Sequence, residues 1–270
     1  MIGFERFLVF MIAMENNFFS GTERQLNILQ WVERQQRISV AEICEQFSVS
    51  EATARRDLET LAGQGKVQRV HGGAIAVQKA PPELPILERQ DEQTDEKHRI
   101  GLAAAQLIQE GETVFLGSGT TVLEVARALR ERRDLTIITN SLPVLNTLSG
   151  TENTIVCLGG MLRSSELSFI GHITEQALAE VRADKVIIGT RAINLEQGLT
   201  NDYLPETMTD RAILLSGREV IVVADNTKFG RMSTALLAPV ESVNIIVTDN
   251  GTPQDFIEAV QRRGIRVIHA

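Results

Sequence analysis

Seven short runs of apolar, mostly β-branched residues recur along the C-terminal two thirds of the chain, and helix-like patterns separate them. Continuous apolar strands that alternate with amphipathic helices are typical of a parallel sheet whose two faces are both covered. We therefore expect an α/β fold here, with a mainly parallel, Rossmann-like sheet. The runs are residues 114–116, 136–138, 154–156, 186–188, 220–223, 245–247 and 265–268.

The N-terminal part of the chain carries three short helical patterns followed by a hairpin pattern. We expect a first helix at about residues 22–36, a second helix that Ser39 caps, and a third from Ser50 to about residue 62. Residues 67–77 read as two short strands joined at Gly72-Gly73. Three helices and a hairpin in so short a segment predict a winged helix-turn-helix.

The third helical pattern has one apolar face and one basic face. Ala54, Leu58 and Leu61 recur at helical spacing, while Arg55 and Arg56 project from the other side. Arginine bonds guanine edges bidentately and grips phosphates, so we predict a recognition helix for double-stranded DNA. A solvated helix face is the alternative. The residues expected at the DNA are Ser50, Thr53, Arg55, Arg56, Lys66, Arg69 and His71.

The charge of the chain is unevenly distributed. A formal net charge of −8 argues by itself against nucleic-acid binding, which needs clustered Lys and Arg. Residues 20–80 nevertheless hold eight Lys or Arg against seven Asp or Glu, so the acidic excess lies elsewhere. A near-neutral segment beside an acidic one is compatible with local DNA contact.

These patterns divide the chain into four parts. Residues 1–19 contain an apolar run too short to span a bilayer, and we interpret them as a disordered extension or a misassigned start, with Met14 as the candidate initiator. Residues 20–78 form the expected DNA-binding domain, and the proline-containing residues 79–95 form a linker. Residues 96–270 form the α/β domain. We expect a cytoplasmic protein.

Polar and glycine-rich loops follow most of the predicted strands. Glycines after the first strand let backbone N–H groups close on an anion, although a turn with a helix cap is the simpler alternative. In a parallel sheet these loops share one edge, which favours a phosphate site. For Asn140 an Asx turn, and for Lys228 a solvated lysine, remain alternatives. The expected ligand residues are Gly117, Ser118, Gly119, Thr120, Thr121, Asn140, Gly159, Gly160, Arg191, Glu206 and Lys228.

Four motifs resemble the DeoR family of bacterial regulators: residues 23–29, 38–43, 49–58 and 69–74. The α/β segments resemble the C-terminal domain of the same family, which is related in fold to pentose-phosphate isomerases and aminosugar-phosphate deaminases. Ala54 stands where the family usually has a larger aliphatic residue, and Gly117 where it commonly has an acidic one. The second difference leaves the hydroxyl pattern of the ligand open, and Asp202 or Glu206 is an alternative holder of sugar hydroxyls.

The resemblance implies a repressor of a carbohydrate-utilisation operon that a phosphorylated sugar releases from its operator. The alternatives are a sugar-phosphate isomerase or deaminase with an appended helical domain, and an α/β domain that only oligomerises the DNA module. We expect a homo-oligomer, because paired half-sites usually supply the required affinity.

The sequence contains no motif for catalysis or cofactor binding. His98 and His172 lack the spacing of a catalytic triad or a metal site. Cys44 and Cys157 lie far apart without a CxxC pattern, and we interpret both as small core residues. We therefore expect no enzyme activity, catalytic residue, metal, cofactor or membrane partner.

Overall fold

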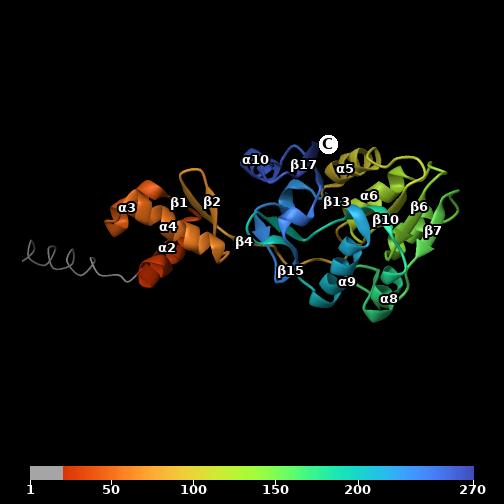
Figure 1. Cartoon of the computed structure of the whole chain (residues 1–270), viewed down its shortest axis with the longest axis horizontal. Helices are drawn as coiled ribbons and strands as arrows, with labels where there is room; N and C mark the ends of the chain where they lie inside the picture. The colour runs from red at the N-terminus through yellow and green to blue at the C-terminus, as the bar shows by residue number, and fades with distance from the viewer. Residues whose placement is uncertain (1–20) are drawn as a thin grey trace, which may run out of the picture. The chain divides into compact units, whose positions relative to one another are not determined.

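The computed structural model describes residues 21–270, which divide into two compact units at residues 78 and 79 (Figure 1). The interpretation of residues 1–19, including Met14, lies outside the described residues. Within residues 21–270 no helix is both long and apolar enough to cross a membrane.

The first unit is a winged helix-turn-helix, as the sequence predicts. Its sheet is antiparallel in the order β1-β3-β2, and β1 is a strand that the sequence patterns do not reveal. The expected joint at Gly72-Gly73 is wrong by one residue, because Gly73 pairs with Val70 and belongs to the last strand. The elements are α2 (Gly21–Gln35), β1 (Arg37–Ser39), α3 (Val40–Phe47), α4 (Glu51–Gly63), β2 (Val67–Val70) and β3 (Gly73–Ala76).

Side-chain caps set the helix boundaries in this unit. Ser39 and Glu42 form a reciprocal capping box at the start of α3, and Ser48 ends that helix in the left-handed conformation with φ of 50°. Ser50 then accepts a hydrogen bond from the Thr53 N–H at the start of α4. The turn between the two helices therefore follows directly from local sequence.

The second unit is built on a seven-stranded, all-parallel sheet in the order β17-β16-β13-β10-β5-β6-β7. Its strands coincide with the seven apolar runs, so the α/β expectation is confirmed. The strands are β5 (Thr113–Leu116), β6 (Thr136–Thr139), β7 (Thr154–Cys157), β10 (Ala183–Ile188), β13 (Gly217–Val223), β16 (Ile245–Thr248) and β17 (Arg266–His269).

Helices cover both faces of this sheet. Because successive strand residues point to opposite faces, Val114 and Leu116 enter one core and Phe115 enters the other. The first core packs under α5 (Thr94–Ala105), α6 (Thr120–Ala128) and α7 (Leu142–Leu148). The second packs under α8 (His172–Ala179), α9 (Leu204–Leu215) and α10 (Gln254–Arg262).

Smaller elements lie on the connections. The strands β8 and β9 form a hairpin, and β11, β12 and β15 form an antiparallel sheet. These elements are β4 (Gln78–Lys79), β8 (Met161–Arg163), β9 (Ser168–Ile170), β11 (Ala192–Asn194), β12 (Gly198–Asn201), η1 (Asn226–Lys228), β14 (Arg231–Met232), β15 (Ala235–Ala238) and η2 (Val240–Ser242).

The sheet reverses its direction of growth beside β5. From β5 the chain adds β6 and then β7 on one side, and it later returns to add β10, β13, β16 and β17 on the other. The loops that follow β5 and β10 therefore diverge to opposite faces and open a crevice at their carboxyl ends, where open α/β sheets bind ligands.

Residues 80–93, which the sequence analysis treats as part of a linker, pack within the second unit. We call this segment the strap. Ile86 is fully buried, and its N–H donates to the Ser165 carbonyl at 2.8 Å. At the start of the strap the Ala80 N–H donates to the Met232 carbonyl at 2.8 Å. The strap thus runs over the α/β unit before α5 begins.

The two cysteines differ in their surroundings. Cys44 is half-buried against the core of the first unit, but Cys157 is exposed. The core interpretation is therefore wrong for Cys157, because β7 lies at the edge of the sheet, where side chains are less covered.

Candidate DNA surface and ligand cavity

The predicted recognition helix is α4, and its basic residues face solvent. Arg55 and Arg56 are both exposed, and the Arg55 guanidinium lies 3.5 Å from the Glu51 carboxylate one turn earlier. Such an exposed pair is only weakly held, so the Arg55 side chain is free to take another partner. Ser50 and Thr53 are joined at the first turn by a 2.9 Å hydrogen bond between their hydroxyls.

Asp57, which the sequence analysis does not single out, anchors α4 from its inner side. Its carboxylate accepts a hydrogen bond from Arg24 Nε at 2.6 Å and another from Gln25 Nε2 at 2.9 Å, both on α2. The Asp57 side chain is only 5% exposed. A signal was present in the sequence, because Asp57 falls on the same helical stripe as Ala54 and Leu61.

The wing residues differ in exposure. Lys66 precedes β2 and His71 lies in the turn before β3, and both are exposed. Arg69 is half-buried on β2, and its Nη1 atom is buried without a hydrogen-bond partner among residues 21–270. Lys66 and His71 are therefore accessible in this arrangement, whereas Arg69 must turn outward to reach a phosphate.

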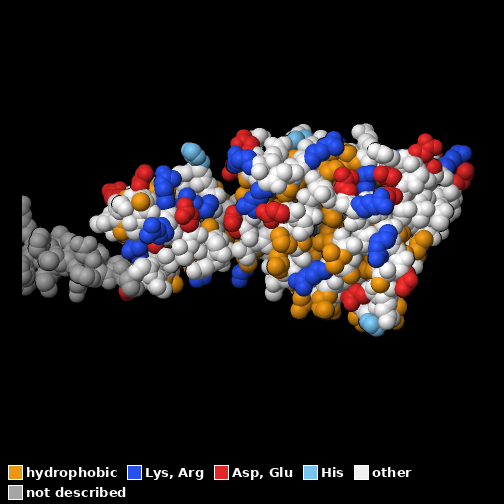
Figure 2. Space-filling model, viewed as in Figure 1, with side chains coloured by type: hydrophobic (Ala, Val, Ile, Leu, Met, Phe, Trp, Pro, Cys, Tyr) orange, Lys and Arg blue, Asp and Glu red, His pale blue; other side chains and the backbone are white. Residues whose placement is uncertain are grey.

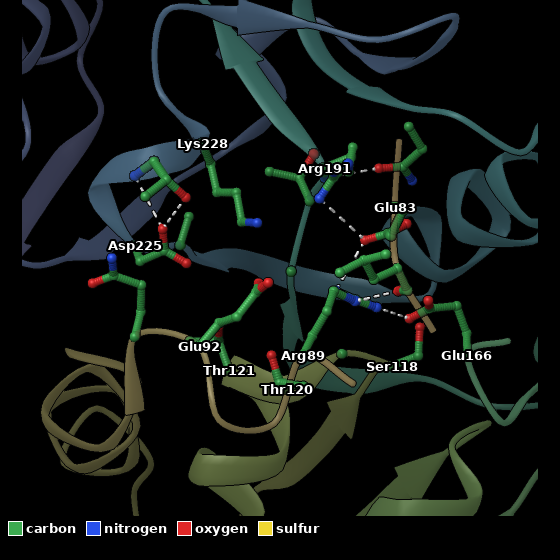
Figure 3. A pocket seen from close by; sticks show the side chains of 18 of the residues that line it. Glu83, Arg89, Glu92, Ser118, Thr120, Thr121, Glu166, Arg191, Asp225 and Lys228 are labelled. Atoms are coloured by element: carbon green, nitrogen blue, oxygen red, sulfur yellow. Dashed lines mark hydrogen bonds and ion pairs between the residues drawn. The ribbon is translucent and has the colours of Figure 1, made fainter. Parts of the chain in front are cut away.

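A cavity of about 760 Å³ opens at the carboxyl ends of β5, β10 and β13, three neighbouring strands (Figure 3). These strands flank the point where the sheet reverses its direction. Seven of the predicted ligand residues line it: Ser118, Gly119, Thr120, Thr121, Arg191, Glu206 and Lys228.

The other four predicted ligand residues are outside the cavity lining. Asn140 follows β6 and donates its side-chain N–H to the Phe169 carbonyl at 2.9 Å. Gly159 and Gly160 follow β7, the edge strand, and a Cβ on Gly160 would lie 2.1 Å from Thr174 Oγ1. Gly117 packs against a side chain of β10. The strands β6 and β7 lie on the far side of β5, so their loops are displaced from the cavity.

The N-terminus of α6 forms one wall of the cavity. Gly119 precedes the helix with φ of 112°, a conformation that favours glycine, and no side chain caps the helix. Ser118 and the hydroxyl-bearing Thr120 and Thr121 line the same wall. An uncapped helix N-terminus presents backbone N–H donors and a partial positive charge, which suits an anion.

Two lysines stand in the cavity lining. Lys228, at the end of η1, points into the cavity, and its ammonium makes no hydrogen bond or ion pair within residues 21–270 (Figure 3). Burial lowers the pKa of Lys228, which Asp225 partly offsets. Lys97 on α5 is 5% exposed and donates to the Arg89 carbonyl at 2.9 Å. Burial lowers its pKa as well.

The strap closes another side of the cavity with charged side chains. Figure 3 shows Glu83 between two guanidinium groups, those of Arg89 and Arg191. One Glu83 oxygen lies 3.0 Å from Arg89 and 3.8 Å from Arg191. Arg89 also pairs with Glu166 in the loop between β8 and β9. Burial raises the pKa of Glu166, and the Glu83 charge adds to this effect.

Glu206, on the first turn of α9, is held by residues of the hairpin. Arg163 forms an ion pair with one carboxylate oxygen, and the Ser168 hydroxyl donates to the other at 2.7 Å. Asp202 lies 3.9 Å from the same arginine. Nearby, burial raises the pKa of Asp210 to about 7 although Arg163 opposes the shift. This wall is therefore rich in paired carboxyl groups.

Sequence reasoning missed several residues of the cavity lining. A signal existed for Lys97, which recurs with Ile100 and Ala104 on the buried face of α5. For the strap residues no signal existed, since their position depends on contacts distant in sequence. The missed charged residues are Glu83, Arg89, Glu92, Lys97, Glu166, Asp210, Asp225 and Arg231.

Comparisons with known proteins match both units. Residues 24–80 match the DeoR-like helix-turn-helix domain, and residues 92–250 match the DeoR C terminal sensor domain. The chain belongs to the DeoR family of transcriptional regulators. The two domains of this DeoR-family chain give it a DNA-binding module and a domain for a small-molecule effector.

Curated relatives match nearly the whole chain. The transcriptional repressor AccR of Agrobacterium fabrum is 36% identical over 91% of this chain and 96% of its own length. The glycerol-3-phosphate regulon repressor of Escherichia coli K12 is 36% identical over 91% of this chain and 98% of its own. The DeoR-family chain is thus a transcriptional repressor by relationship, and the expectation of a regulator rather than an enzyme is confirmed.

Among solved structures, ribose 5-phosphate isomerase A of Methanocaldococcus jannaschii aligns with a TM-score of 0.39 and 18% identity. The alignment covers 51% of this chain and 55% of that protein.

Proposed function

We propose that this DeoR-family repressor controls a carbohydrate-utilisation operon and that a phosphorylated sugar or related metabolite releases it from the operator. The observation that carries the proposal is the cavity wall at α6. There the N-terminus of the helix converges with the Ser118, Thr120 and Thr121 hydroxyls and with the Lys228 ammonium, which has no hydrogen bond or ion pair among residues 21–270. This donor set matches a phosphate dianion better than a neutral sugar.

The relatives support the carbohydrate part of the proposal. Besides the glycerol-3-phosphate regulon repressor, a putative aga operon transcriptional repressor of Escherichia coli O157:H7 is 33% identical over 94% of this chain and 96% of its own length. The name of the first of these relatives refers to glycerol 3-phosphate, which is a phosphorylated polyol. The cavity of about 760 Å³ has the volume of a typical small-molecule site, which is enough for a phosphorylated metabolite of similar size.

The ligand half of the proposal is tested by binding. We expect a sugar-phosphate panel to raise the melting temperature of the full-length protein, and calorimetry to give the dissociation constant of the best member. Lys228→Ala removes a charged donor, and Thr120→Ala removes a hydroxyl that donates to the charged phosphate. Each variant should therefore weaken binding about tenfold or more. Arg218→Ala, on a side chain 88% exposed, is the matched control. If no phosphorylated sugar binds, the effector class is wrong.

The DNA half is tested on α4. We expect Arg56→Ala and Arg55→Ala each to weaken specific operator binding by roughly 1–3 kcal/mol if the side chain reads a base. Glu59→Ala, exposed on the same helix, controls for changes in the helix itself. A gel-shift titration at fixed salt measures the effect, and unchanged affinity in both arginine variants would remove α4 from the interface.

Release is tested by coupling the two measurements. We expect saturating ligand to lower operator affinity about 5- to 150-fold, the usual range of allosteric coupling. A ligand achieves this only if it binds the DNA-competent and DNA-incompetent states unequally. Tighter operator binding with ligand would contradict the repressor-release scheme.

We also propose that the chain works as a homo-oligomer. Large apolar side chains gather on one face of the second unit, over α9 and β15 (Figure 2): Leu204, Met208, Leu215 and Leu236. Leu215 is 84% exposed, and contiguous apolar patches of this kind commonly mark protein–protein contacts. Leu215→Glu should lower the sedimentation coefficient of the full chain, and an unchanged oligomer would exclude this face.

A further inference from the structure

Arg191 binds the first residues of the strap at the cavity. The Arg191 guanidinium, which is 7% exposed, donates to the carbonyls of Pro81 and Pro82 and lies 3.8 Å from the Glu83 carboxylate. Arg89, on the strap itself, donates from Nε to the Leu84 carbonyl at 2.7 Å. Three consecutive strap residues are therefore held at the cavity by Arg191.

Glu83 occupies the position of an anionic ligand. Its side chain is 14% exposed, and a single carboxylate oxygen is shared between two guanidinium groups that both line the cavity. Arg191 Nε is buried and has no hydrogen-bond partner within residues 21–270. The Nε–H donor of this guanidinium is therefore unused within the described residues, and the planar group has the geometry to bind a carboxylate or phosphate through two hydrogen bonds.

The surrounding charges favour an incoming anion that replaces the Glu83 carboxylate over one that binds beside it. Glu166 already pairs with Arg89, and the charge of Glu83 raises the pKa of both Glu166 and Asp210. A further anion beside Glu83 would add like-charge repulsion in a partly desolvated site. A carboxylate that replaces Glu83 keeps the local charge unchanged, and a phosphate there inherits the same two arginine partners.

We infer that Arg89 and Arg191 form a second anion subsite, occupied by Glu83 in the present structure, and that the effector carries a second anionic group that displaces Glu83. The inference rests on the proposed function, in which the first anion lies at the N-terminus of α6. The effector class is therefore a phosphorylated sugar acid or a sugar bisphosphate.

Displacement of Glu83 has a direct consequence for the strap. The chain that leaves Arg191 through Pro81 continues within three residues to Gln78, the last residue of the DNA-binding unit. A ligand that releases the strap changes the tether of that unit without touching the DNA surface. We call the contacts of Glu83 with Arg89 and Arg191 the latch. When the latch is closed in most molecules, the apparent affinity for the ligand falls in proportion to the fraction of molecules in which it is open.

The latch is tested first without any ligand. Hydrogen exchange of the full-length protein should show the Ile86 amide, which bonds to the Ser165 carbonyl, exchanging about fivefold faster or more in Glu83→Gln than in wild type. Glu88→Gln is the matched control, because Glu88 is exposed on the same strap and is not in the cavity lining. Equal exchange in the two variants would show that Glu83 does not hold the strap.

The ligand class is tested with paired probes that differ in one anionic group. The pairs are glucose 6-phosphate with 6-phosphogluconate, and fructose 6-phosphate with fructose 1,6-bisphosphate. Calorimetry should show that Glu83→Gln tightens binding of the doubly anionic member of at least one pair about 5- to 10-fold while changing its singly anionic partner less than twofold. In wild type, only the doubly anionic member should accelerate exchange at Ile86.

The outcomes separate this inference from the proposed function. Singly phosphorylated probes that bind wild type and Glu83→Gln alike, with no gain from a second anionic group, would overturn the second subsite but leave the effector proposal standing. Equal tightening of both members of each pair would also overturn it. If no probe binds wild type or Glu83→Gln, both proposals fail.

Discussion

Asp57→Ala should destabilise the DNA-binding unit selectively. Asp57 is a buried polar contact between α4 and α2, and the substitution removes two hydrogen bonds from its carboxylate, one with Arg24 and one with Gln25. The alanine itself suits a helix, so helix propensity opposes the loss only slightly. The effect therefore measures the tertiary contact and not the helix.

The magnitude follows from burial. Removing one partner of a buried ion pair costs about 3–5 kcal/mol when the other charge stays buried. Arg24 is 17% exposed and recovers part of its hydration, so we expect about 2–3 kcal/mol. A unit of this size has a total stability of only about 3–9 kcal/mol. Asp57→Ala therefore removes a large part of the free energy of unfolding of this unit, and it should lower operator binding at elevated temperature.

The chain provides its own probe for this measurement. Trp31 is its single tryptophan, and it packs edge-on against Phe47 inside the first unit, with ring centroids 6.1 Å apart. Tryptophan fluorescence in a urea titration therefore reports unfolding of that unit alone. With a slope of about 1 kcal/mol per molar urea, the midpoint should fall by about 2–3 M.

Two comparisons decide whether the reasoning is correct. Glu59→Ala removes an exposed carboxylate from the same helix and should shift the midpoint by less than the equivalent of about 0.5 kcal/mol. A double-mutant cycle with Arg24→Ala should give a coupling energy of about 1 kcal/mol or more. A shift for Asp57→Ala no larger than that for Glu59→Ala would refute the anchoring role.

Two further predictions concern backbone packing and pH. A Cβ on Gly73 would lie 2.1 Å from the Ile38 carbonyl oxygen across the β1–β3 pair. We therefore expect Gly73→Ala to lower the free energy of unfolding of the first unit by about 2 kcal/mol or more, measured by Trp31 fluorescence. Gly63→Ala is the control, because open space surrounds its Cβ, and it should not destabilise the unit. Because burial raises the pKa of Asp210 to about 7, the folded state holds the Asp210 proton more tightly than the unfolded state does between about pH 4 and 7. The free energy of unfolding of the second unit should therefore fall as pH rises through this window. Calorimetric melting should show that Asp210→Asn loses about 1–2 kcal/mol less than wild type across the window, a value below the full shift because the carboxyl borders an open cavity.

Local sequence determined the elements of this protein. Each of the seven apolar runs became a strand of the parallel sheet, and the central strands are apolar at nearly every position because both of their faces are buried. Ser39 and Ser50 start their helices through hydrogen bonds within three residues. Such contacts are short-range, so pattern and spacing suffice to predict them.

Sequence also contained partial signals for buried charges. Asp57 and Lys97 each fall on the apolar stripe of a helix, which indicates that each needs a partner. The identity of that partner was not predictable, because Arg24 is 33 positions from Asp57 and its approach depends on how two helices pack.

Only the tertiary structure decided which loops share the cavity. All the predicted loops lie at the carboxyl edge of one sheet, but strand order placed those after β5, β10 and β13 together and left Asn140, Gly159 and Gly160 aside. The strap was likewise invisible in sequence, since Glu83 meets Arg191 across more than a hundred positions. Strand order and strap position depend on the relative stability of whole packed arrangements, which no local pattern encodes.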